Sequence, residues 1–310
     1  MQFKQKLLVA ALGTALIMPA AVWAGELEDL KSEMQKMMER VDQLESQQGS
    51  AAKPAVSSGS SKVRLSLSGQ VNRGLLYVDD GDKTKVHSVD NDASSTRIRL
   101  IAEADPSNTL SIGAAIEVQF ESNSTASVNQ NTGSSGEGPN NFTERRLEVY
   151  FADKRFGKLW LGQGWTASEG SSEVDLSGTD LAGYSDTPVF AGGQIFRKKG
   201  GSMALTDTNV KSVFTNMDGL GRNDRIRYDT PSFAGFTAAT SFTQGDGADL
   251  ALKYKAGYQG MKVAAALAYV DPDSSDVEDQ VNGSISVLLD AGFNGTFAAG
   301  SQSTMKGRDP

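Results

Sequence analysis

The sequence predicts an all-β protein, a transmembrane antiparallel β-barrel preceded by a short coiled-coil helix. Three observations support this fold class. Segments with an apolar residue at every second position follow one another from Val63 onward, as in strands that place one face in lipid and the other in water. Loops rich in Asp, Gly and Asn separate these segments, and an export signal stands at the amino terminus. Together they predict a barrel of the outer membrane.

Residues 1–24 have the features of a signal peptide. Lys4 and Lys6 precede an apolar run over 7–23, and Ala24 completes a small-x-small motif typical of signal peptidase sites. The alternative is a membrane-spanning helix. The run is shorter than the roughly 20 apolar residues that a span needs, and a glycine and a proline interrupt it. Export is therefore the favoured interpretation.

Composition narrows the class further. The chain contains no cysteine, so no disulfide framework holds the exported fold. The formal net charge of −8 becomes two units more negative when Lys4 and Lys6 are removed with the leader. An acidic chain without a basic patch is an unsuitable partner for nucleic acid. No second long apolar stretch follows the leader, which excludes helical membrane spans there.

Residues 25–47 carry a heptad pattern. Apolar residues alternate at spacings of three and four, which places them at the core positions of a coiled coil. These core residues are Leu27, Leu30, Met34, Met37, Val41 and Leu44. A single amphipathic helix on the rim of the barrel is the alternative, because three heptads are short for a free dimer. Residues 48–62 are rich in Gly, Ser and Ala and are expected to form a flexible linker.

Residues 63–310 form the expected barrel domain. In the segment 110–120, for example, Leu110, Ile112 and Ile116 alternate with Ser111 and Glu117, so the two faces differ in polarity. About eleven strands are expected: 63–78, 95–104, 110–120, 142–152, 158–164, 224–229, 233–243, 248–258, 260–270, 281–290 and 293–300.

The connections alternate in length, as in a barrel with all its long loops at one end. Those at 79–94, 121–141, 165–223 and 271–280 are long, and the others are short. Long loops are expected outside the cell and short turns in the periplasm. An odd number of strands and a polar ending at Pro310 predict a barrel that is incomplete at its carboxyl end.

The connection 165–223 is too long to be idle in a compact domain, and we expect it to fold into the barrel as a constriction. Its expected acidic side comprises Glu169, Glu173, Asp175, Asp180 and Asp186. The expected basic side lies on the polar faces of the wall strands and comprises Arg97, Arg99, Arg146, Arg225 and Arg227. Opposed charges would set a transverse field across the solute path. Alternatively, the arginines pair with Glu103, Glu117, Glu148 and Asp229 on adjacent strands and neutralise the wall.

Several longer runs add a family resemblance. They are Ser68-Gly69-Gln70-Val71-Asn72-Arg73-Gly74-Leu75-Leu76-Tyr77, Phe156-Gly157-Lys158-Leu159-Trp160-Leu161-Gly162-Gln163-Gly164, Glu173-Val174-Asp175-Leu176-Ser177-Gly178-Thr179 and Arg222-Asn223-Asp224-Arg225-Ile226-Arg227-Tyr228-Asp229-Thr230-Pro231. Over roughly 62–270 these runs resemble the general porins of Gram-negative bacteria. The resemblance implies a 16-stranded barrel that assembles as a homotrimer in the outer membrane, in contact with lipid and lipopolysaccharide.

The resemblance also implies a function, passive diffusion of small hydrophilic solutes and ions through a water-filled channel. It implies that the third outer loop, 165–223, forms the constriction. The amino-terminal coiled coil resembles periplasmic extensions of some trimeric channels and is expected to clamp the trimer or to reach toward the cell wall. The sequence departs from the porin pattern in two respects. The last strands and the terminal aromatic residue are absent, and the loop is longer than expected.

No enzymatic site and no cofactor are predicted. The single histidine, His87, lies in a polar segment and is expected to be solvated. Asp271, Asp273 and Asp276 offer a weak Ca²⁺ candidate on an outer loop, but the glycine and the bidentate glutamate of a calcium loop are missing. Two alternatives to a general porin stay open. One is a substrate-specific channel, and the other is a structural tether or adhesin that uses its barrel as an anchor.

Overall fold

The computed structural model describes residues 62–132, 141–183, 185–200, 203–272 and 276–304. All of them belong to one of two units of the chain, Val56–Pro310. The predicted signal peptide, coiled coil and nearly all of the linker lie outside the described residues. Among the residues described, no helix has the length and apolar character needed to cross a membrane.

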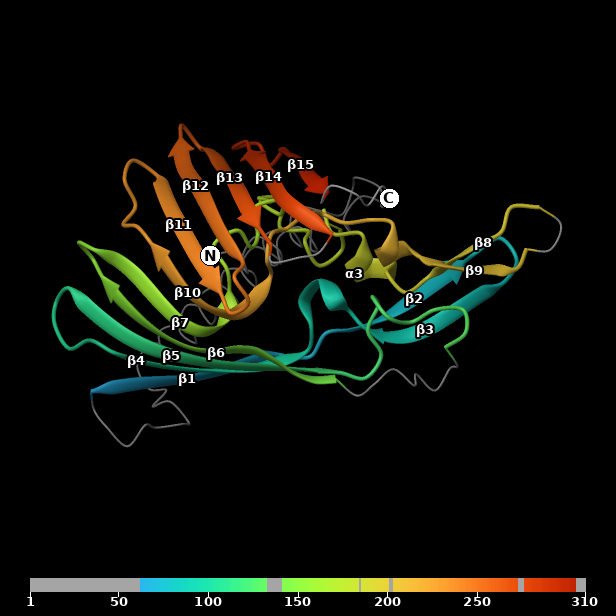
Figure 1. Cartoon of the computed structure of the whole chain (residues 1–310), viewed down its shortest axis with the longest axis horizontal. Helices are drawn as coiled ribbons and strands as arrows, with labels where there is room; N and C mark the ends of the chain where they lie inside the picture. The colour runs from blue at the N-terminus through green and yellow to red at the C-terminus, as the bar shows by residue number, and fades with distance from the viewer. Residues whose placement is uncertain (1–61, 133–140, 184, 201–202, 273–275, 305–310) are drawn as a thin grey trace, which may run out of the picture. The chain divides into compact units, whose positions relative to one another are not determined.

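The main element is one curved antiparallel sheet of eleven strands (Figure 1). Its strands, in spatial order, are β1 (Val63–Gln70), β4 (Arg97–Ala104), β5 (Leu110–Glu121), β6 (Asn141–Asp153), β7 (Gly157–Trp165), β10 (Arg222–Asp229), β11 (Phe236–Thr243), β12 (Ala248–Tyr258), β13 (Met261–Asp271), β14 (Val277–Leu288) and β15 (Asn294–Thr304). The all-β fold and the number of about eleven wall strands are confirmed. β1 and β15 are the two edges of the sheet in the described part of the chain.

Within the described residues, two short hairpins and three helical turns complete the fold. β2 (Arg73–Asp79) pairs with β3 (Thr84–Asp90), and β8 (Ile195–Arg197) pairs with β9 (Leu205–Asn209). The helical turns are η1 (Asp92–Ser94), α3 (Pro188–Ala191) and η2 (Val210–Ser212). The hairpins lie side by side at one end of the main strands (Figure 1), where an Arg197–Asp80 ion pair joins them.

The prediction of one continuous strand over 63–78 is wrong. The strand ends at Gln70, and the chain restarts as β2 in a different sheet. The side chains at the break bind the neighbouring segment: Gln70 Nε2 donates to the Ser94 carbonyl at 2.8 Å, and Asn72 Nδ2 donates to the same oxygen at 2.9 Å. These bonds turn the chain away from β4, although the apolar alternation continues through the break.

The two faces of the sheet differ as the alternation predicts. Large apolar side chains remain exposed along the outer face, among them Leu67, Ile98, Ile116, Leu147, Ile226, Leu250, Leu267, Val281 and Ile285. Soluble proteins rarely expose a contiguous apolar surface of this extent, and a lipid-facing band accounts for it. The inner face, defined here by Glu117, Arg225, Ser241, Asp249 and Ser284, is polar and buried.

Gly113 on β5 makes room for an aromatic side chain on the inner face. It lies opposite Tyr150 of β6, and a Cβ atom built on Gly113 would approach Tyr150 Cζ to 2.2 Å. The Tyr150 hydroxyl donates to Glu103, and its ring contacts that of Trp160 at 5.0 Å between centroids. The glycine therefore leaves room for this ring beside β5.

Replacing Gly113 by alanine is expected to lower the stability of the folded protein by about 1–3 kcal/mol, because the new methyl group displaces the Tyr150 ring. Gly295→Ala on β15 is the matched control, since nothing lies within 4 Å of its Cβ position. The measurement is the temperature at which each folded protein loses its heat-modifiable mobility in gel electrophoresis. Equal transition temperatures for the two variants would contradict the prediction.

Candidate functional site

The candidate site lies on the inner face of the sheet, where the connection between β7 and β10 crosses it. This connection, called the long loop here, comprises residues 166–221. Hydrogen bonds attach the first part of the loop to β11, β12 and β14, whereas its β8–β9 hairpin lies beside β2 and β3 at one end of the main strands (Figure 1). The loop carries α3, the β8–β9 hairpin and η2.

Small side chains make the surface that receives the long loop. Ala239, Ala251 and Ala268 of the sheet form a buried cluster with Ala167 of the loop. A loop backbone can lie close to a strand only where side chains are short. Larger residues at these inward positions would hold the loop away from the wall. The run of alanines and serines on β11–β14 therefore shapes the interior.

Two serines of β14 bind the loop as a neighbouring strand would. Ser284 Oγ accepts from the Val174 amide at 2.9 Å and donates to the Ser171 carbonyl at 2.7 Å. Ser286 Oγ accepts from the Leu176 amide at 3.0 Å. The serines and the amides are each two residues apart, so the extended loop segment follows the inner face in register with β14.

Asp249 fixes the beginning of the long loop. Its Oδ2 accepts from the Ser168 amide at 2.8 Å and from Ser168 Oγ at 2.5 Å, while its Oδ1 accepts from the Ser241 amide at 3.0 Å and from the Ser241 hydroxyl. Ser241 Oγ in turn accepts from the Ala167 amide at 2.8 Å. Asp249 is 3% exposed. Four donors satisfy this buried carboxylate, which joins loop to wall.

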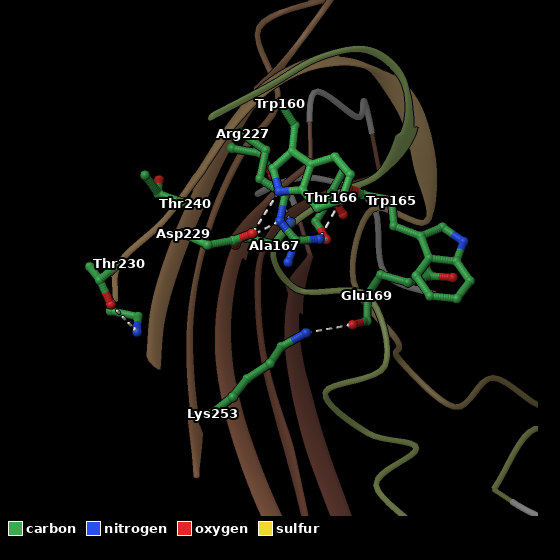
Figure 2. A network of polar contacts seen from close by, with 12 residues as sticks. Trp160, Trp165, Thr166, Ala167, Glu169, Arg227, Asp229, Thr230, Thr240 and Lys253 are labelled. Atoms are coloured by element: carbon green, nitrogen blue, oxygen red, sulfur yellow. Dashed lines mark hydrogen bonds and ion pairs between the residues drawn. The ribbon is translucent and has the colours of Figure 1, made fainter. Parts of the chain in front are cut away.

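Arginine side chains hold the carbonyls where the loop leaves β7. Arg225 Nε donates to the Trp165 carbonyl at 3.0 Å, and Arg227 donates to the Thr166 carbonyl at 2.8 Å and to Asp229 Oδ1 at 2.8 Å. Figure 2 shows Arg227 between Asp229 and this backbone, and Lys253 reaching the Glu169 carbonyl, to which its ammonium donates at 3.0 Å. Cationic side chains thus hold the backbone at the start of the long loop.

Three acidic side chains of the long loop, Glu169, Glu173 and Asp218, interact with one another. Asp218 accepts from the Gly170 amide at 2.6 Å and the Ser172 amide at 3.0 Å, which ties the two ends of the loop together. Glu173 accepts from Asn216 at 2.6 Å. Gly219 allows the close approach: its φ is +76°, and a Cβ there would lie 2.1 Å from Ser168 Oγ.

Burial and mutual repulsion raise the pKa values of these loop carboxyls. Burial, and then the charge of Asp218, raise the pKa of Glu169 to about 7. Burial, and then Asp218 and Glu169, raise the pKa of Glu173 to about 8. Burial also raises the pKa of Asp186 and of Asp218. The charge of the loop therefore changes near neutral pH.

The other predicted acidic residues are arranged differently. Asp175 accepts from the Ser177 amide at 2.9 Å and from Thr296 Oγ1 on β15 at 3.1 Å, so it helps to hold the loop on the wall. Asp180 is exposed, and Asp186 is half-buried. The five predicted acidic residues therefore spread along the loop. Glu169, Glu173 and Asp186 interact electrostatically with Asp218, whereas Asp175 binds Ser177 and Thr296.

The predicted basic residues pair with carboxylates of neighbouring strands. Glu117, which is 1% exposed, lies 3.6 Å from Arg97 and 2.7 Å from Arg145, and it also pairs with Arg99. Glu148 pairs with Arg146 and Arg225, and Asp229 pairs with Arg227. Of the carboxylates named in the alternative, Glu103 contacts Arg64 instead, at 3.8 Å. Arg97, Arg99 and Arg146 keep part of their surface exposed.

Two residues of the candidate site, Arg145 and Asp218, were not predicted from the sequence. Arg145 reaches the inner face because a register shift lies between Glu117 and Val118, opposite which β6 carries one extra residue. The positive charges of Arg222, Lys253 and Arg145 lower the pKa of Glu169, against the larger effects of burial and of Asp218, which raise it. Nothing in the local sequence marks the bulge or the role of Asp218.

His87 differs from expectation, and part of the calcium candidate lies outside the described residues. His87 lies on β3 and is 4% exposed, so the expectation of a solvated histidine is wrong. Alternation along β3 turns it inward, since Val89 and His87 share the buried face. Of the calcium candidates, Asp273 lies outside the described residues. In the part of the chain that the structure describes, no group of acidic or histidine side chains is placed to hold a metal.

Comparisons with known proteins give one family. The family model described as Gram-negative porin matches residues 49–309. No match was found among curated protein sequences.

Three similar solved structures have TM-scores of 0.40 to 0.42. An anion-selective porin from Comamonas acidovorans is 16% identical, with 76% of this chain and 72% of that chain covered (TM-score 0.42). The outer membrane channel DcaP of Acinetobacter baumannii is 14% identical, with 82% of each chain covered (TM-score 0.40). OmpT, an outer membrane protein of Vibrio cholerae, is 13% identical, with 74% of this chain and 60% of that chain covered (TM-score 0.42).

Proposed function

Because this chain belongs to the Gram-negative porin family, we propose that it forms a water-filled channel through which small hydrophilic solutes and ions diffuse passively across the outer membrane. The observation that supports this most directly is the long loop on the inner face, held by Asp249, Ser284 and Ser286. A loop fixed inside the curve of a membrane sheet narrows the path without closing it.

The loop and the wall together make a charged constriction. Glu169 and Glu173 supply the acidic side, and Arg97, Arg99 and Arg145 around Glu117 supply the basic side. Opposite charges across a narrow passage orient water and favour polar solutes over apolar ones. The ion pairs of the wall hold the arginines in place, and each arginine keeps part of its side chain exposed.

The complete channel is proposed to be a homotrimer of 16-stranded barrels. Residues 25–47 would form a periplasmic coiled coil that clamps the trimer or reaches the cell wall, and the heptad pattern of these residues supports this role. Lipid would surround the exposed apolar band of the outer face, and lipopolysaccharide would contact the outer loops.

Single-channel recording in a planar bilayer tests the proposal. The full gene product is expected to give stepwise openings in groups of three and a modest reversal potential under a salt gradient. A folded protein that gives no conductance would overturn the porin proposal and favour a tether or adhesin. Saturation of conductance by one solute, without general permeability, would favour a substrate-specific channel.

Ion selectivity is expected to depend on pH between about 6 and 8, where Glu169 and Glu173 change charge. Their folded pKa values lie above the ordinary value of 4.5, so the folded protein binds more protons than the unfolded chain in this window. Lowering the pH therefore stabilises the loop and removes its negative charge. The permeability ratio of cations to anions should fall as the pH decreases from 8.5 to 6.

Glu173→Gln should reduce this pH dependence, because it removes the carboxyl with the higher pKa. The control is Asp180→Asn, which removes an exposed acid of the same loop. Reversal potentials recorded across the pH range compare the three proteins. A pH dependence that Asp180→Asn weakens as much as Glu173→Gln would show that general loop charge, and not the buried cluster, is responsible.

A further inference from the structure

A cavity lies among three outer loops, apart from the proposed constriction. The β2–β3 hairpin, the segment 122–132 and the β8–β9 hairpin enclose about 300 Å³. Val78, Asp80, Lys83 and Lys85 come from the first of these, Gln130 and Asn131 from the second, and Gln194, Arg197 and Leu205 from the third. The volume lies at the lower end of the range for small-molecule sites.

The walls of this cavity are fixed by polar contacts. Arg197 lies 2.8 Å from Asp80 Oδ2 and 3.3 Å from Asp82 Oδ2, which joins the two hairpins. The side chain of Gln130 donates to the Ile195 carbonyl at 2.8 Å and accepts from the Ile195 amide at 2.9 Å, as a neighbouring strand would. The cavity is therefore built into the fold, and the Arg197–Asp80 ion pair forms part of its wall.

Two cationic groups in the cavity keep free bonding capacity. Within the described residues, no carboxylate pairs with Lys83 or Lys85. Lys85 Nζ donates to the Gln130 carbonyl, which uses one of the three ammonium donors. Lys83 lies on the rim and is exposed, whereas Lys85 is half-buried. After the Arg197–Asp80 pair is discounted, the lining carries a net positive charge.

A buried acceptor in the same cavity has no partner. Gln194 is 8% exposed, and its Nε2 donates to the Val128 carbonyl at 2.7 Å. Its Oε1 is buried and has no hydrogen-bond partner among the residues that the structure describes. A buried acceptor left without a donor costs about 1–3 kcal/mol, so a donor from a bound molecule would stabilise this oxygen. Gln194, Lys83 and Lys85 all line the same cavity.

We propose that this cavity binds a small hydroxylated anion of the sugar-acid type. Its carboxylate meets the ammonium groups of Lys83 and Lys85, and one of its hydroxyls donates to Gln194 Oε1. Val78 and Leu205 supply apolar surface for the carbon face of the ring. The ligand is either a free solute or an acidic sugar of the cell-surface polysaccharide. This site is additional to the proposed channel and does not depend on conductance.

Titration calorimetry of the folded full-length protein in detergent with sodium D-glucuronate tests the proposal. Wild-type protein is expected to bind glucuronate saturably and to bind methyl glucoside, which lacks the carboxylate, much more weakly. The double variant Lys83→Gln/Lys85→Gln is expected to bind glucuronate about ten-fold or more weakly, since it loses charge-assisted hydrogen bonds. The matched control is Lys198→Gln/Lys199→Gln, which removes the same charge from two exposed lysines outside the cavity lining.

Any of three results would refute the proposed site. They are no saturable binding of glucuronate to the wild-type protein, equal affinity for glucuronate and methyl glucoside, and an equal loss of glucuronate binding in both double variants. The thermal transition of each variant shows that it is folded. A competition arm with purified lipopolysaccharide separates the two sources of ligand. Displacement of glucuronate supports the site with surface polysaccharide as its ligand, and binding without displacement supports it with a free solute.

Discussion

Replacing Asp249 by alanine is expected to release the beginning of the long loop and to change the channel more than any other single loop contact. The change leaves the Ser168 and Ser241 amides without their acceptor in a buried position. Two unsatisfied buried donors cost roughly 2–5 kcal/mol. We expect a larger and noisier single-channel conductance, because the loop no longer stays on the inner face. Bilayer recording measures both properties.

Limited trypsin digestion gives a second readout, because Arg197, Lys198 and Lys199 lie in the same loop. The released loop should be cut faster. Asp249→Asn should have an intermediate effect, since one amide oxygen can still accept while the hydroxyls of Ser168 and Ser241 reorient. The control is Asp224→Ala, which removes an exposed aspartate of β10. Wild-type conductance and cleavage in Asp249→Ala would refute the anchoring role.

Replacing Glu117 by glutamine is expected to destabilise the folded protein by about 3 kcal/mol, because the change leaves three partly buried guanidinium groups without their counter-charge. Arg97, Arg99 and Arg145 all contact this carboxylate. The variant should also shift the reversal potential toward anion selectivity, since the wall gains net positive charge. The thermal transition and the reversal potential measure these two effects.

The control for Glu117→Gln is Glu144→Gln. Glu144 is an exposed residue of β6, and the same chemical change there should affect neither measurement. The predicted role of Glu117 would be refuted if the two variants gave the same thermal transition and the same reversal potential. A loss of stability without a change in selectivity would mean that the arginines move away from the lumen when they lose their partner.

The strands were predictable because their signal is local. A side chain on a strand points in or out according to its parity alone, so Leu250 and Leu252 could be assigned to the outer face and Asp249 to the inner face from the sequence. The expected and observed bounds agree for the 248–258 segment. The prediction over 63–78 was wrong because the break depends on where Gln70 and Asn72 find acceptors, and those acceptors lie more than twenty residues away.

The candidate site was only partly predictable. The length of the connection after Trp165 and its acidic residues pointed to a loop inside the barrel, and the polar faces of β4 and β10 pointed to a basic wall. The sequence did not show which of these side chains pair with one another. Glu117 and Arg145 meet because of a bulge, and Asp218 meets Ser172 across forty-six residues of chain.

By itself, the sequence determined the fold class, the polarity of the two faces, the family and the segment that enters the interior. Alternation and loop length are properties of neighbouring residues, so they can be recognised without knowing which residues are in contact. Only the tertiary structure decided which charges cancel, which carboxyls share a buried cluster and which loops enclose a cavity. Those outcomes depend on distances between residues far apart in the chain, because a hydrogen bond needs direct contact and charge–charge energies weaken with distance.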